Sequence, residues 1–293
     1  MKQPIFTGSC VALVTPFTEN GVDFAKFEEL IERQIKEGTD AILVCGTTGE
    51  ASTMPDEEHK SVIRFAIEKI NKRVHVMAGA GSNDTKHAIE LSQFCEAAGA
   101  DSILSVTPYY NKTTQEGIYQ HFKVIAESIH IPVVLYNVPS RTNLNINPST
   151  LKRLSAISNI VAVKECNLLQ MVETLYLCGD DLIHYSGEDG NVVPMMALGG
   201  KGIISVMANI IPADTHRMAQ AYLDGDHQTS LDLQIKTLPI ERALFCETNP
   251  IPVKAAMNLM GMNVGRGRLP LVDISEHGMG ILKEALKGYG LIK

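Results

Sequence analysis

The chain has 293 residues, of which 45% are hydrophobic and 20% are charged, so it can bury a large core and shows no disordered or fibrous bias. Its formal net charge is −7, with Lys and Arg scattered among Asp and Glu, which argues against nucleic acid or an anionic membrane as the main partner. We therefore expect small-molecule ligands.

Short apolar runs typical of buried parallel strands recur along most of the chain. The eight runs are residues 11–15, 41–45, 74–78, 102–107, 133–137, 160–164, 182–186 and 203–207. Amphipathic stretches between them, such as 24–35, 55–70 and 85–98, have the apolar spacing of one helix face. Eight strand-helix units in about 220 residues predict an α/β fold, a closed (β/α)8 TIM barrel, with a doubly wound open sheet as the alternative.

Strand signals stop after residue 226. The remainder predicts helices at 227–245, 252–260 and 274–286, separated by segments rich in Gly, Pro and Asn. We expect a catalytic barrel over residues 1–226 and a C-terminal helical domain over 227–293.

The N-terminal hexapeptide lacks the apolar core of a signal peptide, and no apolar stretch is long enough to cross a bilayer, so we expect a cytoplasmic protein. The six cysteines are far apart and form no Cys-x-x-Cys pair. We expect them to be mostly buried free thiols. They are Cys10, Cys45, Cys95, Cys166, Cys178 and Cys246.

Lys164 ends the apolar run 160–164. Burial disfavours the charged ammonium, so a lysine in a buried strand is shifted toward the neutral amine that attacks carbonyls. Such a lysine can form a Schiff base. The alternative is a lysine that extends out of the strand end to pair with an acid.

Other predicted strands end in polar residues, and in a barrel these ends face one site. Thr47 and Thr48 lie between two glycines in a turn that suits a small carboxylate, although a plain polar turn explains the pattern equally well. Tyr110 and Tyr136 can supply the proton donors that imine chemistry needs, whereas tyrosines at strand ends are commonly packing residues. Arg141 has a bidentate fork suited to a second carboxylate.

Five motifs together resemble the 4-hydroxy-tetrahydrodipicolinate synthase family, also called dihydrodipicolinate synthase, within the pyruvate-dependent class I aldolases. The matching segments are Gly-Thr-Thr-Gly-Glu at 46–50, Pro-Tyr-Tyr-Asn at 108–111, 136–142, Val-Lys-Glu at 163–165 and 247–254. The resemblance implies condensation of pyruvate with L-aspartate 4-semialdehyde, without a cofactor or a metal, in the diaminopimelate route to lysine. Another pyruvate aldolase, of the sugar-acid or N-acetylneuraminate type, and a non-catalytic small-molecule sensor are the alternatives.

The resemblance also implies a role for each site residue. Lys164 forms the imine, Tyr136 transfers protons, and Thr47 and Tyr110 complete a hydroxyl relay, with Tyr110 reaching across a subunit interface. The substrate-binding residues are Thr48 for the pyruvate carboxylate, assisted by the backbone near Ile204, Arg141 for the semialdehyde carboxylate, and Gly187. The family is usually a homotetramer, so a dimer of dimers is expected.

Two segments depart from the family pattern. After Lys164 the chain is two residues shorter and lacks a glycine, which predicts a tighter loop that brings Cys166 nearer the pocket. His59, Asn83 and Tyr109 match the lysine-feedback site of the family. The positions that are usually His and Glu in lysine-sensitive enzymes are Asp56 and His87 here, which predicts weak or absent inhibition by lysine.

Overall fold

A computed structural model describes residues 2–293, and within that range eight parallel strands close into a barrel. The order around the barrel is β1, β10, β9, β8, β7, β6, β5 and β4, so each strand neighbours the preceding and the following barrel strand of the chain. The predicted closed barrel is confirmed, and the open doubly wound sheet is wrong. The barrel strands are β1 (Gly8–Ala12), β4 (Ala41–Val44), β5 (His75–Gly79), β6 (Ser102–Val106), β7 (Val133–Asn137), β8 (Ile160–Glu165), β9 (Ile183–Ser186) and β10 (Gly202–Ser205).

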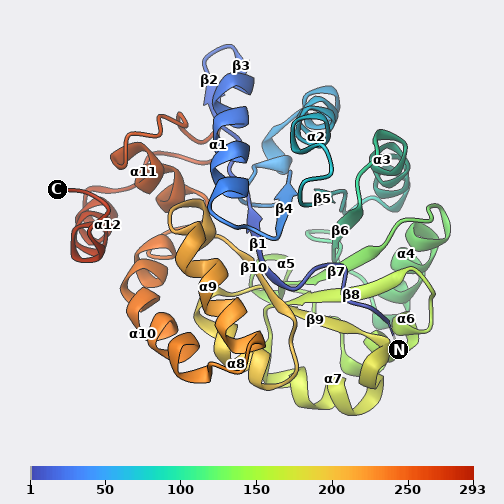
Figure 1. Cartoon of the computed structure of the whole chain (residues 1–293). Helices are drawn as coiled ribbons and strands as arrows, with labels where there is room; N and C mark the ends of the chain where they lie inside the picture. The colour runs from blue at the N-terminus through green and yellow to red at the C-terminus, as the bar shows by residue number, and fades with distance from the viewer. Residues whose placement is uncertain (1) are drawn as a thin grey trace.

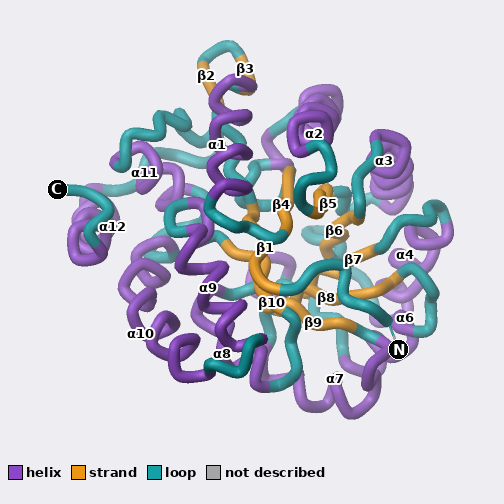
Figure 2. The backbone as a smooth tube through the Cα atoms, viewed as in Figure 1, coloured by secondary structure: helices purple, strands orange, loops and turns teal. Residues whose placement is uncertain are grey.

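Helices surround the strands on the outside of the barrel (Figures 1 and 2). They are α1 (Phe24–Lys36), α2 (Asp56–Ile70), α3 (Thr85–Ala98), α4 (Gln115–Glu127), α6 (Pro148–Ser155), α7 (Met171–Cys178), α8 (Val192–Ala197) and α9 (Pro212–Leu223). The short helix α5 (Pro139–Thr142) directly follows β7 and lies near the barrel centre in Figure 1. Short 3-10 turns at Ala51–Thr53, Leu168–Gln170, Gly179–Asp181, Asp189–Asn191 and Met207–Asn209 lie between the longer elements. A small hairpin of β2 (Phe17–Thr18) and β3 (Gly21–Val22) precedes α1.

Three helices follow the last barrel unit: α10 (His227–Leu244), α11 (Ile251–Leu259) and α12 (Glu276–Tyr289). They lie together at one side of the barrel (Figure 1). Helix α10 packs against α9, and α12 packs against α10 and α11. The helices predicted for this part of the chain are present, with ends that differ by up to three residues.

The first strand begins at Gly8 rather than at residue 11. Gly8 and Ser9 have no apolar side chain, yet both are buried and pair with β10. The Ser9 amide also donates to the Asp40 carboxylate over 2.7 Å. A search for apolar runs misses such residues, because their burial depends on backbone pairing rather than on side-chain hydrophobicity.

Alternate residues of each strand fill the barrel interior. Val134 of β7 and Ala162 of β8 belong to this interior core. Since side chains two residues apart on a strand share a face, Tyr136 and Lys164 face the same interior, one step closer to the carboxyl ends of the strands. Tyr136 and Lys164 therefore lie at the carboxyl end of the barrel interior.

The N-terminal segment closes the opposite end of the barrel. Phe6 stacks on Tyr185 with ring centroids 4.2 Å apart, and the Tyr185 hydroxyl donates to the Phe6 carbonyl over 2.7 Å. The Lys2 ammonium donates to the Ser155 carbonyl over 2.6 Å and also to the Ile160 carbonyl at the start of β8. These contacts fix the segment across the amino ends of the strands.

Candidate active site

Lys164 lies at the carboxyl end of the barrel, one residue before β8 ends. Its side chain is 5% exposed, and its register partners are Tyr136 on β7 and Tyr185 on β9. Burial lowers the pKa of the Lys164 ammonium, and the neighbouring Cys166 and Glu188 partly oppose that shift. The environment therefore favours the neutral amine, which is the nucleophilic form.

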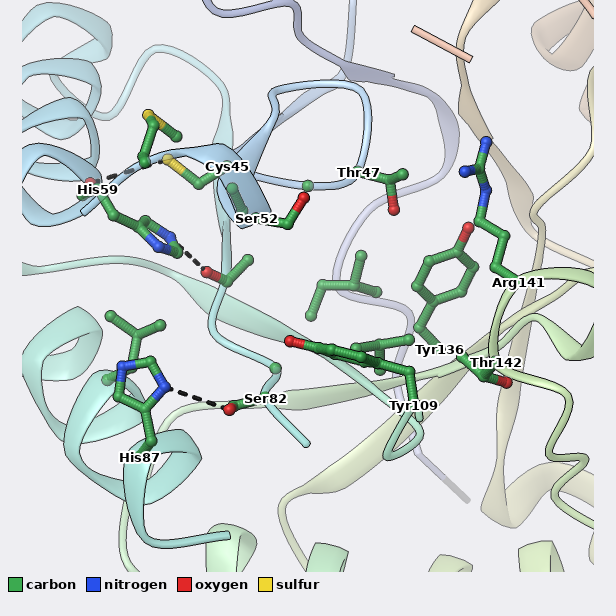
Figure 3. Close-up of a pocket in the computed structure, with 18 of the residues that line it drawn as sticks. Cys45, Thr47, Ser52, His59, Ser82, His87, Tyr109, Tyr136, Arg141 and Thr142 are labelled. Atoms are coloured by element: carbon green, nitrogen blue, oxygen red, sulfur yellow. Dashed lines mark hydrogen bonds between the residues drawn. The ribbon is translucent and has the colours of Figure 1, made fainter. Parts of the chain in front are cut away.

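Tyr136 is the nearest aromatic group to this amine. The Lys164 Nζ lies 4.4 Å from the centroid of the Tyr136 ring. Burial raises the pKa of the Tyr136 phenol, while the charge of Arg141 and a hydrogen bond with Thr47 act in the opposite direction. The phenol is thus a protonated group beside the amine, able to give a proton to an oxygen that leaves from it. Figure 3 shows Thr47, Tyr136 and Arg141 gathered on one side of a cavity.

The turn after β4 carries Thr47 and Thr48 and is held tightly. Cys45 and Glu50, at its two ends, have φ angles of 54° and 57°. A Cβ at Gly49 would lie only 3.0 Å from the Leu13 carbonyl oxygen, so a larger residue there would displace the backbone. Thr48 is buried in this turn, where its hydroxyl oxygen accepts a hydrogen bond of 2.9 Å from Asn249.

Arg141 comes from the short helix α5, directly after β7. It is exposed, in contrast to Lys164, and its Nη2 donates to the main-chain carbonyl of Asn249 over 3.2 Å. A guanidinium at the open side of the cavity can pair with the carboxylate of an entering ligand.

A cavity of about 180 Å³ connects these groups. Its lining combines the buried amine, two threonine hydroxyls, a phenol and a guanidinium, which suits a small ligand with a carbonyl and a carboxylate. Six of the predicted site residues line it: Thr47, Thr48, Tyr136, Arg141, Lys164 and Gly187.

Two predicted site residues do not line this cavity. Ile204 is buried within β10 and belongs to the barrel-interior core. Tyr110 is 92% exposed and has a φ of 69°.

Asn249 and Glu188 also line the cavity, although neither was predicted to be a site residue. Asn249 lies in the segment 247–254 that carried the family resemblance, so the motif marked it without revealing its contacts. Glu188 follows the last residues of β9, where polar residues at a barrel strand end are candidates for the site.

The loop after Lys164 is tight, and it brings Cys166 beside the lysine. A Cβ at Gly187 would lie 2.4 Å from the Cys166 Sγ and 3.3 Å from the Lys164 Cε. The loop is fixed by Glu165, whose carboxylate accepts a hydrogen bond of 2.7 Å from the Asn167 amide. Burial raises the pKa of Glu165 to about 7, although its hydrogen bonds oppose that shift.

A second cavity, of about 410 Å³, adjoins the first and shares Thr47, Tyr136 and Arg141 with it. His59, Ser82, His87 and Tyr109 lie around its other side (Figure 3). The two residues that depart from the family pattern are in direct contact here. The His87 Nε2 lies 3.1 Å from both carboxylate oxygens of Asp56.

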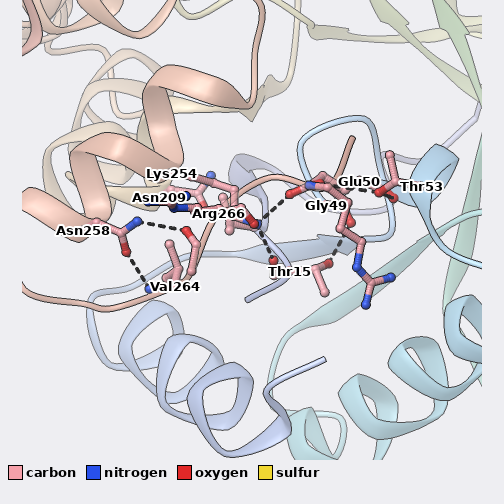
Figure 4. A network of polar contacts seen from close by, with 12 residues as sticks. Thr15, Gly49, Glu50, Thr53, Asn209, Lys254, Asn258, Val264 and Arg266 are labelled. Atoms are coloured by element: carbon pink, nitrogen blue, oxygen red, sulfur yellow. Dashed lines mark hydrogen bonds and ion pairs between the residues drawn. The ribbon is translucent and has the colours of Figure 1, made fainter. Parts of the chain in front are cut away.

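A buried ion pair joins the threonine turn to the C-terminal helices (Figure 4). The Lys254 Nζ lies 2.6 Å from Glu50 Oε1, and the two side chains are 3% and 0% exposed. Lys254 also donates to the carbonyls of Thr15 and Arg266, over 3.2 and 2.9 Å. Because Glu50 ends the turn that holds Thr47 and Thr48, helix α11 fixes one wall of the cavity.

Among residues 2–293, no group of three or more His, Cys, Asp or Glu side chains lies close enough together to hold a metal ion. In the same range, no helix combines the length and apolarity needed to cross a membrane.

Comparisons with known proteins agree with the motifs. The sequence profile of the dihydrodipicolinate synthetase family matches residues 5–288. A protein of Acetivibrio thermocellus named 4-hydroxy-tetrahydrodipicolinate synthase is 64% identical over 292 residues, covering 100% of both chains. A protein of the same name from Thermoanaerobacter sp. is 55% identical over 293 residues, covering 99% of each chain. The crystal structure of dihydrodipicolinate synthase from Aquifex aeolicus, 44% identical, has a TM-score of 0.95 and covers 98% of this chain and 99% of that chain.

Proposed function

Because the chain belongs to the dihydrodipicolinate synthetase family, we propose that it condenses pyruvate with L-aspartate 4-semialdehyde to give 4-hydroxy-tetrahydrodipicolinate, in the diaminopimelate route to lysine. One observation supports this most directly. The desolvated amine of Lys164 shares a small cavity with a phenol and with two groups that suit carboxylates, Thr48 and Arg141.

The chemistry begins on Lys164. Its neutral amine attacks the keto carbon of pyruvate, and the carbonyl oxygen leaves as water after taking protons that pass through Tyr136. The resulting imine withdraws electrons, so the methyl group loses a proton and becomes an enamine. The enamine carbon attacks the aldehyde carbon of the second substrate, whose oxygen becomes a hydroxyl. The amino group of that substrate then attacks the imine carbon, closes the ring and releases Lys164.

The remaining residues bind and relay. Thr48 and the backbone near Ile204 hold the pyruvate carboxylate, and Gly187 leaves room beside the imine. Arg141 holds the semialdehyde carboxylate at the open side of the cavity. Thr47 connects Tyr136 to Tyr110 in a hydroxyl relay.

Tyr110 completes that relay from a partner subunit in a homotetramer built as a dimer of dimers. Its 92% exposure supports this role, because a subunit interface can bury the apolar ring that the single chain leaves exposed. The barrel of residues 1–226 and the helical domain of residues 227–293 form each subunit. We place the protein in the cytoplasm, where a biosynthetic enzyme of this kind finds its substrates.

The experiment that tests the proposal combines trapping and turnover. Sodium borohydride with pyruvate should reduce the imine and add one pyruvate-derived group to Lys164, located by peptide mass spectrometry. A coupled assay with both substrates should show turnover that Lys164→Ala abolishes and that Arg141→Ala weakens for the semialdehyde. Lys86→Ala, at a lysine with 85% side-chain exposure, is the matched control and should change neither readout.

The outcomes separate the alternatives. Trapping without turnover on aspartate semialdehyde, but with turnover on a sugar-derived aldehyde, would assign another pyruvate aldolase. Failure to trap any adduct on Lys164 would refute the imine mechanism and favour a non-catalytic sensor.

A further inference from the structure

Asn249 lies between the two groups proposed to hold the substrate carboxylates. Its side-chain Nδ2 donates to Thr48 Oγ1 over 2.9 Å, and its main-chain carbonyl accepts from Arg141 Nη2 over 3.2 Å. The residue is 4% exposed and lines the cavity of Lys164. One residue of the C-terminal helical part thus contacts both receptors, through two different groups.

The contact with Thr48 determines what the threonine hydroxyl can do. A hydroxyl has one proton to donate and two lone pairs that accept. Because the Asn249 amide occupies one lone pair, the Thr48 proton stays free. Across residues 2–293 the hydrogen bonds include none in which Thr48 Oγ1 acts as the donor, so the proton is available for a ligand in the cavity.

Asn249 is held in place by its neighbours, although one of its side-chain atoms destabilises the fold. It lies two residues before the start of α11, the helix that the Lys254–Glu50 ion pair holds against the threonine turn. Its Oδ1 is buried and has no hydrogen-bond partner among the described residues. An unpaired buried acceptor destabilises a fold, so the amide is better explained by its contact with Thr48 than by a contribution to packing.

We propose that Asn249 is a positioning residue whose side-chain amide directs the Thr48 hydroxyl proton toward the carboxylate of pyruvate. This inference rests on the proposed function. The side chain acts on the pyruvate half of the site, whereas the Arg141 contact uses the main chain and survives substitution. The neutral variant Asn249→Ala should therefore alter the use of pyruvate and leave the use of the semialdehyde nearly unchanged.

The test compares Asn249→Asp and Asn249→Ala with the wild type. Aspartate has nearly the shape of asparagine, but its carboxylate can only accept hydrogen bonds. It therefore accepts a hydrogen bond from the Thr48 hydroxyl and places a negative charge near the pyruvate carboxylate. We expect the pyruvate concentration at half-saturation of borohydride trapping to rise about 10- to 100-fold in Asn249→Asp, the range for loss of a hydrogen bond to a charged group. Asn249→Ala leaves the Thr48 hydroxyl without this partner and adds no competing acceptor. It should raise the half-saturating pyruvate concentration about 3- to 10-fold.

Three controls make the result specific. Asn20→Asp introduces the same change at an exposed asparagine of the β2–β3 hairpin and should behave as wild type. Circular dichroism checks that each variant is folded, and Asn249→Ala serves if the aspartate variant does not fold. In the coupled assay with Asn249→Ala, the KM for the semialdehyde should stay within about two-fold of wild type, because Arg141 keeps its main-chain partner and no charge is added beside it.

A double-mutant cycle tests whether Asn249 acts through Thr48. If it does, Asn249→Ala added to Thr48→Val weakens pyruvate trapping no further than Thr48→Val alone. Additive losses would overturn the proposal, as would half-saturation within about two-fold of wild type in both Asn249 variants. These results are distinct from failure of the proposed function, in which the wild type itself traps no pyruvate or makes no product.

Discussion

Replacing Lys254 by Met should destabilise the protein strongly, because it leaves Glu50 as a buried, unpaired charge. At the observed separation of 2.6 Å, the attraction between the two charges is about 6 kcal/mol at an effective dielectric constant of about 20. Desolvation of the two ions costs several kcal/mol each, so the intact pair is close to neutral in its net effect. Breaking it is different, because the attraction is lost while the desolvation cost of the buried Glu50 carboxylate remains.

We expect Lys254→Met to lower the free energy of unfolding by about 3–5 kcal/mol, the range for removal of one partner of a buried ion pair. For a chain of this length the melting temperature should fall by about 5–15 °C. Urea denaturation followed by far-UV circular dichroism measures the free energy, and scanning calorimetry measures the melting temperature. The control is Lys86→Met, which removes the exposed Lys86–Glu90 pair and should leave the denaturation midpoint unchanged.

The double variant Glu50→Leu/Lys254→Met gives the decisive comparison. Since it leaves no unpaired charge, it should lose less stability than the sum of the two single variants, by at least about 1 kcal/mol. A Lys254→Met variant within about 1 kcal/mol of wild type, or a strictly additive double variant, would show that this pair is not the buried, coupled unit described above.

Three further predictions concern the site. Gly187→Ala should reduce turnover at least about ten-fold, because a Cβ at position 187 would lie 2.4 Å from the Cys166 Sγ. Adding Cys166→Ala to the same chain should restore part of the lost turnover in the coupled assay. Since burial lowers the pKa of Lys164, trapping of pyruvate should persist at pH values where an exposed lysine is almost fully protonated. The trapping should decline as the pH falls through that lowered pKa. A pH profile of trapping that matches free lysine would contradict this prediction. Lysine should inhibit weakly or not at all, because Asp56 and His87 bind each other where the family's lysine-sensitive members have other residues; micromolar inhibition in a steady-state assay would refute this expectation.

The fold could be predicted because its signals are local. Eight apolar runs alternating with amphipathic stretches require parallel strands covered by helices, and the closed barrel satisfies all of them. The start of β1 at Gly8 was missed for a physical reason, since a residue without an apolar side chain is buried there by pairing with Gly202. Helix ends were displaced for a similar reason, because caps and turn contacts decide them rather than periodicity.

The site was predictable in part. Lys164 and Tyr136 follow from their places at the ends of neighbouring strands, because strand ends of a barrel converge. The contact between Thr48 and Asn249 joins residues 201 positions apart, and no periodic pattern records such a pair. For Ile204 the strand was predicted correctly, but a contact between its backbone and a ligand depends on how far into the barrel the ligand binds. No residue pattern along the chain determines that distance.

The N-terminal segment that stacks Phe6 on Tyr185 also limits the side from which ligands reach the cavity. It covers the amino ends of the strands, and side chains fill the barrel interior between it and the cavity, so ligands approach Lys164 from the carboxyl side. Because Arg141 and the adjoining larger cavity lie on that same side, both substrates share one approach. We therefore expect the keto acid to bind before the aldehyde, and excess aldehyde to compete with it for this approach.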